Sequence, residues 1–130
     1  MVSGRLPISA KNVEVIVRQE DGSLRAFYNV CLHRGNKLIE HEGFGNVEDG
    51  FLCAYHHWCY DFTGALKKIP DIETFPQGAP RPPRIPALPV GEWGSFVWFS
   101  LNPDVEPLEE YLDPVNSHLA PYHFERMRWV

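Results

Sequence analysis

The sequence has few cysteines, no long apolar run and no cluster of basic residues. Its 130 residues include three cysteines, which cannot all pair with one another. No apolar stretch is long enough to cross a bilayer, and no charged leader precedes an apolar core, so we expect neither a membrane span nor a secretion signal. A formal net charge of -5 argues against nucleic acid as a partner. These absences favour a reducing cytoplasm, where thiols stay free or bind a metal.

The strand-forming segments are short and separated by turn signals. Residues 13–18 and 24–28 are rich in β-branched and aromatic types and flank an Asp-Gly pair, which predicts a β-hairpin. A second hairpin is expected from residues 51–55 to 57–62, with a Cys-His pair at its bend. A third is expected to turn at Thr63-Gly64 and return over residues 65–69. The overall expectation is a mostly β domain of antiparallel strands with long functional loops.

The C-terminal half gives weaker signals. Residues 95–100 predict a buried strand, and residues 107–112 predict a short helix with Pro107 in its first turn. Residues 76–89 contain six of the twelve prolines, which resist both helices and central strands. We expect this segment to be an extended surface loop rather than a linker between two domains, because too few residues follow it to form a second core.

Two short clips each combine a cysteine with a histidine: Cys31-x-His33 and Cys53-x-x-His56. A structural zinc site uses two cysteines and two histidines, but usually keeps the cysteines in one clip and the histidines in the other. A two-iron cluster of mixed ligation places both thiolates on one iron and both imidazoles on the other. Because each clip here supplies one ligand of each type, the order favours the iron–sulfur cluster over zinc.

The stretch "CLHRG", followed by "CAYHHWCYDFTGAL", resembles the Rieske [2Fe-2S] domain of ring-hydroxylating, Rieske-type non-heme iron oxygenases. That family has Cys-x-His-Arg-Gly, then Cys-Pro-Tyr-His-Gly-Trp-x-Tyr. The likeness continues through "GSFVWFSLNPDVEPLEEYL", and "LAPYHFERMRWV" is similar to the opening of the family's catalytic domain. This chain departs from the pattern in a slightly longer spacer after His33, in Ala54 for proline and in His57 for glycine.

The resemblance implies a mostly β, Rieske-type antiparallel β-sandwich with a cluster-binding subdomain made of two Cys-His loops. It implies a Rieske domain over residues 1–112, with the cluster-binding part at about 29–70, and a tail over 113–130 that resembles the start of a missing catalytic domain. The implied cofactor is a Rieske [2Fe-2S] cluster held by Cys31, His33, Cys53 and His56. Five further residues are expected to surround it: Arg34, Gly35, Tyr55, Trp58 and Tyr60.

Three further features of the sequence need an interpretation. His56, rather than the adjacent His57, is expected to be the ligand, because its two-residue interval from Cys53 matches the family. Cys59 is the only cysteine left over, so no disulfide between the loops is expected, and we interpret it as a small buried residue. His118 and His123 have the spacing of the family's mononuclear iron ligands, but Pro121 argues against a rigid helix there, so the spacing is interpreted as coincidence.

The function implied by the resemblance is one-electron transfer within the oxygenase component of an aromatic-ring-hydroxylating dioxygenase, in aromatic hydrocarbon catabolism. Electrons would come from a ferredoxin or a flavin reductase. They would pass to a mononuclear iron site, absent from this chain, in a catalytic domain or a neighbouring oxygenase subunit. Two alternatives remain at this point: a free-standing Rieske ferredoxin and a zinc-stabilised binding module.

Overall fold

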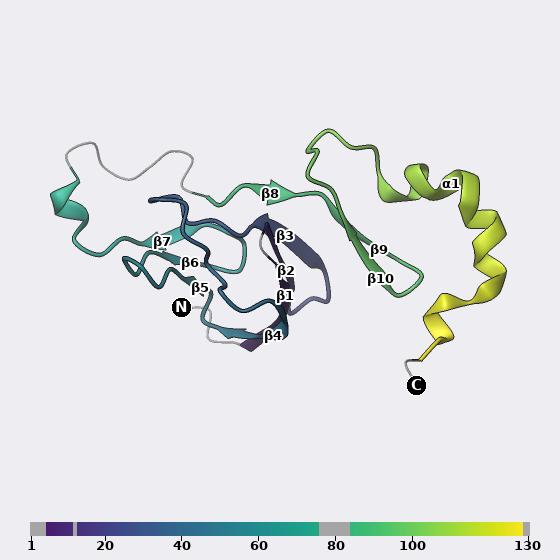
Figure 1. Ribbon diagram of the computed structural model, residues 1–130, viewed down its shortest axis with the longest axis horizontal. Coiled ribbons are helices and arrows are strands. Elements are labelled where there is room, and N and C mark those ends of the chain that lie inside the picture. The colour runs from purple at the N-terminus through teal and green to yellow at the C-terminus, as the bar shows by residue number, and fades with distance from the viewer. Residues whose placement is uncertain (1–4, 12, 76–83, 129–130) are drawn as a thin grey trace. The chain divides into compact units, whose positions relative to one another are not determined.

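The chain divides into two compact units, Met1–Ala87 and Leu88–Val130, which are described separately below (Figure 1). The computed structural model describes residues 5–11, 13–75 and 84–128. The division into residues 1–112 and 113–130 that the resemblance implies stays a prediction. No helix in the described ranges is long and apolar enough to span a membrane.

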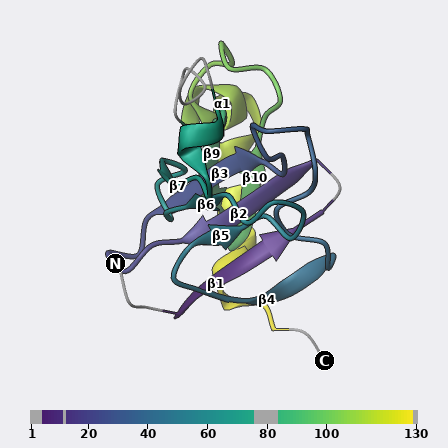
Figure 2. The same ribbon diagram turned by 90° about the vertical axis from the view of Figure 1, so that its left-hand side faces the viewer.

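The larger sheet of the first unit has the strand order β4-β1-β2-β3-β8. Four of its strands, β1 to β4, are labelled in Figure 2. Its strands are β1 (Arg5–Ala10), β2 (Glu14–Arg18), β3 (Leu24–Tyr28), β4 (Gly43–Glu48) and β8 (Ala87–Leu88). The first predicted hairpin is confirmed, because β2 and β3 pair antiparallel with Val15 opposite Phe27. β1 pairs antiparallel with both β2 and β4, so the segment between the two Cys-His clips forms an edge of this sheet.

The smaller sheet of the first unit carries the second Cys-His clip. It consists of β5 (Phe51–Leu52), β6 (Cys59–Tyr60) and β7 (Leu66–Lys68), in that order and antiparallel. Both remaining predicted hairpins are therefore confirmed. Their strands are shorter than expected because the loop from Cys53 to Trp58 takes up the residues between β5 and β6.

The core of the first unit contains side chains from both sheets and from both clips. Its buried members are Leu6, Ile8, Ala10, Val15, Val17, Phe27, Cys31, Leu38, Phe51, Cys53, Trp58, Tyr60, Phe62 and Ile85. Cys31 is 2% exposed and Cys53 is 1% exposed. The two thiols are thus part of the apolar core, which fixes the loops that carry them.

The proline-rich segment differs in part from the prediction. Residues 76–83 lie outside the described residues, but residues 84–88 are not a surface loop. Ile85 is 1% exposed, its amide donates to the Gly64 carbonyl at 2.8 Å, and Tyr28 donates to the Pro86 carbonyl at 3.1 Å. Ala87–Leu88 then forms the edge strand β8. Flanking prolines are tolerated there because an edge strand does not need every amide donor.

The second unit contains a hairpin and a helix. Strands β9 (Val90–Trp93) and β10 (Phe96–Phe99) pair antiparallel. The predicted strand at residues 95–100 is confirmed, but its predicted burial is wrong: all four residues of β10 are exposed. Among the described residues β9 and β10 pair only with each other, and a sheet of two strands is too small to bury its own side chains.

The helix of the second unit is longer than predicted. Helix α1 runs over Leu108–Leu119, and Pro107 precedes it as the N-cap instead of lying in its first turn. Pro114 lies inside the helix, where it removes one backbone donor. The helix nevertheless continues, and the Ala120 amide still donates to the Asn116 carbonyl. Two 3-10 turns follow, η2 (Ala120–Tyr122) and η3 (Phe124–Arg126).

Asp61 organises the turn that joins β6 to β7. Its carboxylate accepts hydrogen bonds from the Thr63 amide at 2.8 Å, the Thr63 hydroxyl at 2.6 Å and the Ala65 amide at 3.1 Å. Burial acts to raise the pKa of Asp61, but these hydrogen bonds outweigh it and hold the pKa below its usual value. The ionised carboxylate therefore stabilises the turn.

We expect Asp61→Asn to lower the free energy of unfolding by about 1–2 kcal/mol at pH 7. Because the folded-state pKa is depressed, the unfolded carboxyl binds a proton first as the pH falls. The difference between the two proteins should therefore be complete well above pH 3.8, the ordinary value, and should shrink below it. Urea unfolding at pH 7 and near pH 3.5 measures this.

Asp21→Asn is the matched control. Asp21 accepts the same pair of hydrogen bonds from the Ser23 amide and hydroxyl, but in an exposed turn. At pH 7, Asp21→Asn should lower the free energy of unfolding by less than Asp61→Asn does. Equal effects at the two turns would contradict the role assigned to Asp61.

Candidate metal centre

The two Cys-His clips are built on the same backbone turn. In the first loop, residues 31–36, the Cys31 amide donates to the Asn36 carbonyl at 2.7 Å and the Gly35 amide donates to the Cys31 carbonyl at 2.9 Å. Gly35 has φ 74°, in the left-handed region that glycine adopts without strain. The loop therefore reverses direction directly after its histidine and arginine.

The second loop, residues 53–58, repeats these bonds. The Cys53 amide donates to the Trp58 carbonyl at 2.9 Å, and the His57 amide donates to the Cys53 carbonyl at 2.9 Å. His57 thus occupies the position that Gly35 has in the first loop, and its φ is 58°. A histidine in this region carries strain, as the sequence comparison with the family's glycine suggested.

The four predicted ligands come together as two pairs. Cys31 and Cys53 lie side by side in the core, and burial, together with the neighbouring Cys53 thiol, raises the pKa of Cys31. The imidazoles of His33 and His56 lie with their ring centroids 4.5 Å apart, and both residues are half-buried. The structure therefore separates a buried pair of sulfurs from a more accessible pair of imidazoles.

One nitrogen of His33 has no hydrogen-bond partner among the residues that the structure describes. His33 is half-buried as a residue, but its Nδ1 atom is fully buried and makes no hydrogen bond. Burial lowers the pKa of His33, and electrostatic interactions with His56 and Arg34 lower it further. A buried polar atom without a partner is costly and needs an explanation, and a bound metal supplies one. The donor set and this atom together fit the implied [2Fe-2S] cluster.

Tyr60 connects the smaller sheet to the first loop. Its hydroxyl accepts the Leu32 amide at 3.0 Å and lies 3.3 Å from the sulfur of Cys31. Burial raises the pKa of Tyr60 well above its usual value, and the hydrogen bond to Cys31 adds to this. The hydroxyl therefore keeps its proton, and Cys31 is the acceptor in reach for it.

The other residues predicted to surround the cluster differ in how closely they approach the two histidines. Trp58 is buried and stacks on His33, with ring centroids 4.7 Å apart and an 8° interplanar angle. Tyr55 lies 3.8 Å from His56, centroid to centroid, and is 59% exposed. Arg34 is exposed on the first loop.

Three residues that contact the site were not predicted: Asn29, Asn36 and Phe75. The buried Asn29 side chain donates to the carbonyls of Lys11 and Ile39 and accepts the amides of Leu38 and Ile39, so it fastens the chain on both sides of the first loop. The Asn36 side chain lies 3.9 Å from the Cys53 sulfur and links the loops. Asn29 directly follows a strand, where asparagine is a turn signal, but its burial has no sequence signal.

The leftover cysteine and the C-terminal histidines lie elsewhere. All three cysteines are free, and Cys59 is half-buried where we expected full burial, with its sulfur 3.4 Å from the His57 carbonyl. It alternates with Trp58 and Tyr60, whose side chains fill the core, so its own side chain faces outward. His118 lies in α1, whereas His123 lies between η2 and η3 with φ 50°.

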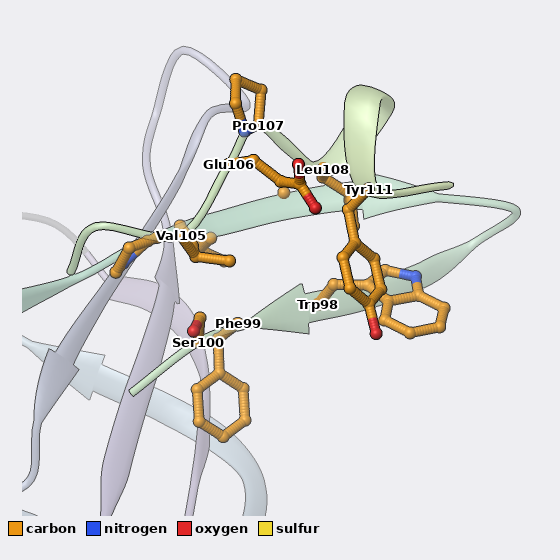
Figure 3. A pocket seen from close by; sticks show the side chains of 11 residues that line it. Trp98, Phe99, Ser100, Val105, Glu106, Pro107, Leu108 and Tyr111 are labelled. Atoms are coloured by element: carbon orange, nitrogen blue, oxygen red, sulfur yellow. The ribbon is translucent and has the colours of Figure 1, made fainter. Parts of the chain in front are cut away.

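A cavity of about 480 Å³ lies within the second unit (Figure 3). It is lined by β10 and by the start of α1, including Trp98, Phe99, Leu108 and Tyr111. None of its lining residues is a cysteine or histidine. It is therefore distinct from the metal centre.

The pairwise arrangement distinguishes the two kinds of metal site. Among the residues that the structure describes, no three His, Cys, Asp or Glu side chains converge as one metal ion requires. A structural zinc site needs four ligands around a single ion. A mixed Cys/His cluster needs only two protein ligands on each iron, and two such pairs are what the loops present.

Comparison with known proteins decides between these. The family model of the Rieske [2Fe-2S] domain matches residues 6–89. The chain belongs to this Rieske family. Membership carries a Rieske-type [2Fe-2S] cluster as the cofactor and confirms the predicted resemblance and the mostly β fold class.

Two of the curated relatives are large oxygenase components of dioxygenase systems. The chain is 38% identical over 117 residues to that of the 2,4-dinitrotoluene dioxygenase system from Burkholderia sp. (strain RASC), covering 83% of this chain and 24% of the relative. It is 37% identical over 113 residues to that of the naphthalene 1,2-dioxygenase system from Pseudomonas putida, covering 83% and 24%. The chain thus spans about a quarter of the length of these relatives.

Solved structures of Rieske oxygenases share the fold. The quaternary ammonium Rieske monooxygenase CntA with L-carnitine superposes with a TM-score of 0.77 at 28% identity, over 88% of this chain and 33% of that one. Naphthalene 1,2-dioxygenase with indole bound superposes with a TM-score of 0.74 at 29% identity, over 92% and 28%. In both, the likeness extends beyond residue 89.

We expect Tyr60→Phe to lower the midpoint potential of the Rieske protein by roughly 60 mV, which for one electron is about 1.4 kcal/mol, the size of one hydrogen bond. Bound to iron, the Cys31 sulfur would be a thiolate, which can only accept the proton of the Tyr60 hydroxyl 3.3 Å away. Such a bond favours the reduced, more negative state. Redox titration followed by EPR measures the shift. An unchanged or raised potential would show that the Tyr60 proton points away from the sulfur.

Proposed function

We propose that this chain carries single electrons as the Rieske part of an aromatic-ring-hydroxylating oxygenase, with Cys31, His33, Cys53 and His56 as the ligands of its cluster. The observation that carries the proposal is the separation of the ligands into a buried pair of sulfurs and an accessible pair of imidazoles. A Rieske cluster uses its two irons in this way, and when bound it takes up and releases one electron at a time.

The residues of the site would each have a distinct part. Cys31 and Cys53 would hold one iron inside the core. His33 and His56 would hold the other, His33 through Nδ1, its buried and unpaired nitrogen. Tyr60 supports the sulfur side through its hydroxyl, and Trp58 fixes the plane of the His33 ring by stacking on it. Rigid placement by neighbouring groups is what tunes such sites.

The assignment of His56 rather than His57 rests on the turn. The His56 ring lies 4.5 Å from that of His33 and 3.8 Å from Tyr55, between centroids. His57 is exposed at the left-handed position that Gly35 occupies in the first loop. In the first loop this position is a glycine, which has no side chain to bind a metal. We therefore propose that the His57 side chain, at the same position of the second loop, does not bind the metal either.

The proposed partners follow from the relatives, whose names describe oxygenase components of multi-protein systems. Electrons would arrive from a ferredoxin or flavin reductase in the cytoplasm. They would leave to a mononuclear iron site in a catalytic domain or neighbouring oxygenase subunit. The half-buried His56 and the exposed Tyr55 form the edge of the site that a partner can approach.

The free-standing ferredoxin has less support. The family model matches residues 6–89, which contain both loops and would suffice for a carrier. The match to the dinitrotoluene dioxygenase component covers 83% of the chain and so includes residues of the second unit. That extent favours the oxygenase.

A histidine series tests the proposal. The unmodified protein, produced with iron supplied, should contain about two iron and two acid-labile sulfide per chain. His56→Ala should abolish cluster assembly, because one iron would lose half of its protein ligands. His57→Ala should keep the visible spectrum, and His57→Gly should also raise the free energy of unfolding by about 0.5–1 kcal/mol by relieving the backbone strain.

The contrary outcomes are equally clear. If His57→Ala bleaches the protein and His56→Ala does not, the ligand assignment is wrong by one residue. If the unmodified protein binds stoichiometric zinc and no sulfide under these conditions, the electron-transfer function itself is wrong.

A further inference from the structure

The His33 ring lies in an aromatic enclosure of three rings, two from the second loop and one from residue 75. Trp58 of the second loop covers one face, and His56 meets the ring at 70° with centroids 4.5 Å apart. Phe75, far along the sequence, meets it at 66° with centroids 5.9 Å apart. Phe75 also packs against Trp58, with ring centroids 5.7 Å apart. His56 and Trp58 thus both belong to the second loop, and Phe75 comes from outside the two loops.

The segment before Phe75 is a turn that directs this one side chain inward. The 3-10 turn η1 (Ile72–Thr74) follows Asp71, and the Thr74 amide and hydroxyl both donate to the Asp71 carbonyl. The Phe75 amide then donates to the Ile72 carbonyl at 3.1 Å. Every residue of η1 is exposed, including the apolar Ile72 at 42%, whereas Phe75 is half-buried and packs on the core.

We propose that Phe75 is a positioning residue that closes the enclosure and keeps water away from the metal-binding nitrogen of His33. The inference rests on the proposed function, because it takes His33 as a ligand. It explains why Nδ1 is fully buried although His33 as a residue is only half-buried. It also makes the two histidines unequal: His56 contacts the exposed Tyr55, whereas His33 is covered by Phe75.

Two measurable consequences follow from opening the enclosure. A chelator reaches the His33 side of the site more readily when water does, so the metal should be lost faster. Water also stabilises the state of greater charge. With two thiolates the oxidised centre is neutral and the reduced centre carries one negative charge, so access of water should raise the midpoint potential.

The experiment compares Phe75→Ala with Phe75→Leu and Phe44→Ala. Leucine keeps an apolar cover of similar size, whereas alanine removes it. Phe44 is an aromatic residue on β4 that is 95% exposed, so its variant controls for the loss of a phenyl ring. Three quantities are measured on each cluster-loaded protein: the rate of bleaching in excess chelator without denaturant, the midpoint potential, and urea unfolding.

Phe75→Ala should bleach about fivefold faster, which corresponds to about 1 kcal/mol, and its midpoint potential should rise. Phe75→Leu should restore most of both properties, and Phe44→Ala should match the unmodified protein. If Phe75→Ala lowers only the urea midpoint while bleaching and potential stay unchanged, Phe75 is a packing residue and the inference is overturned. An unmodified protein without labile sulfide would instead overturn the proposed function and, with it, this inference.

Discussion

The site depends on one backbone turn that is used twice. In each loop the cysteine amide donates to the carbonyl five residues on, and the cysteine carbonyl accepts the amide four residues on. These two bonds bring the loop back on itself and require a positive φ at the fifth position, which Gly35 and His57 adopt. With both cysteines fixed in the core, the intervening histidines have only the outer side of the loops to occupy. The separation of sulfurs from imidazoles is therefore a consequence of the turn.

Because the two thiols are buried, the hydrogen bonds around them are stronger than they would be at the surface. In a dry core each polar contact to sulfur is stronger than it would be in water, and Tyr60 and Asn36 provide such contacts from another strand and from the other loop. Asn29 satisfies four backbone groups around the base of the first loop. The same residues that hold the loops in place thus set the electrostatic surroundings of the proposed ligands.

Local sequence patterns predicted much of the fold and of the candidate site. Most of the features that were missed depend on contacts between residues distant in the sequence. The hairpins and the four candidate ligands were visible because turn signals and ligand spacing act over a few residues. The exposure of β10 could not be predicted. The sequence of Phe96–Phe99 would be equally suited to a strand in a covered sheet and to one in a two-stranded sheet. The strand at Ala87–Leu88 and the contact of Phe75 with His33 join segments distant in sequence. The length of α1 was missed because it continues through a proline.

The central claim is that two imidazoles, His33 and His56, bind one iron while the thiols bind the other. Pulsed EPR of the reduced protein, labelled with ¹⁵N only in histidine, tests it most directly. The account predicts an average g below the free-electron value and two strongly coupled histidine nitrogens. The whole signal should be lost when His33 or His56 is replaced, and it should remain when His57 is replaced. A spectrum with one coupled nitrogen, or with none, would contradict it.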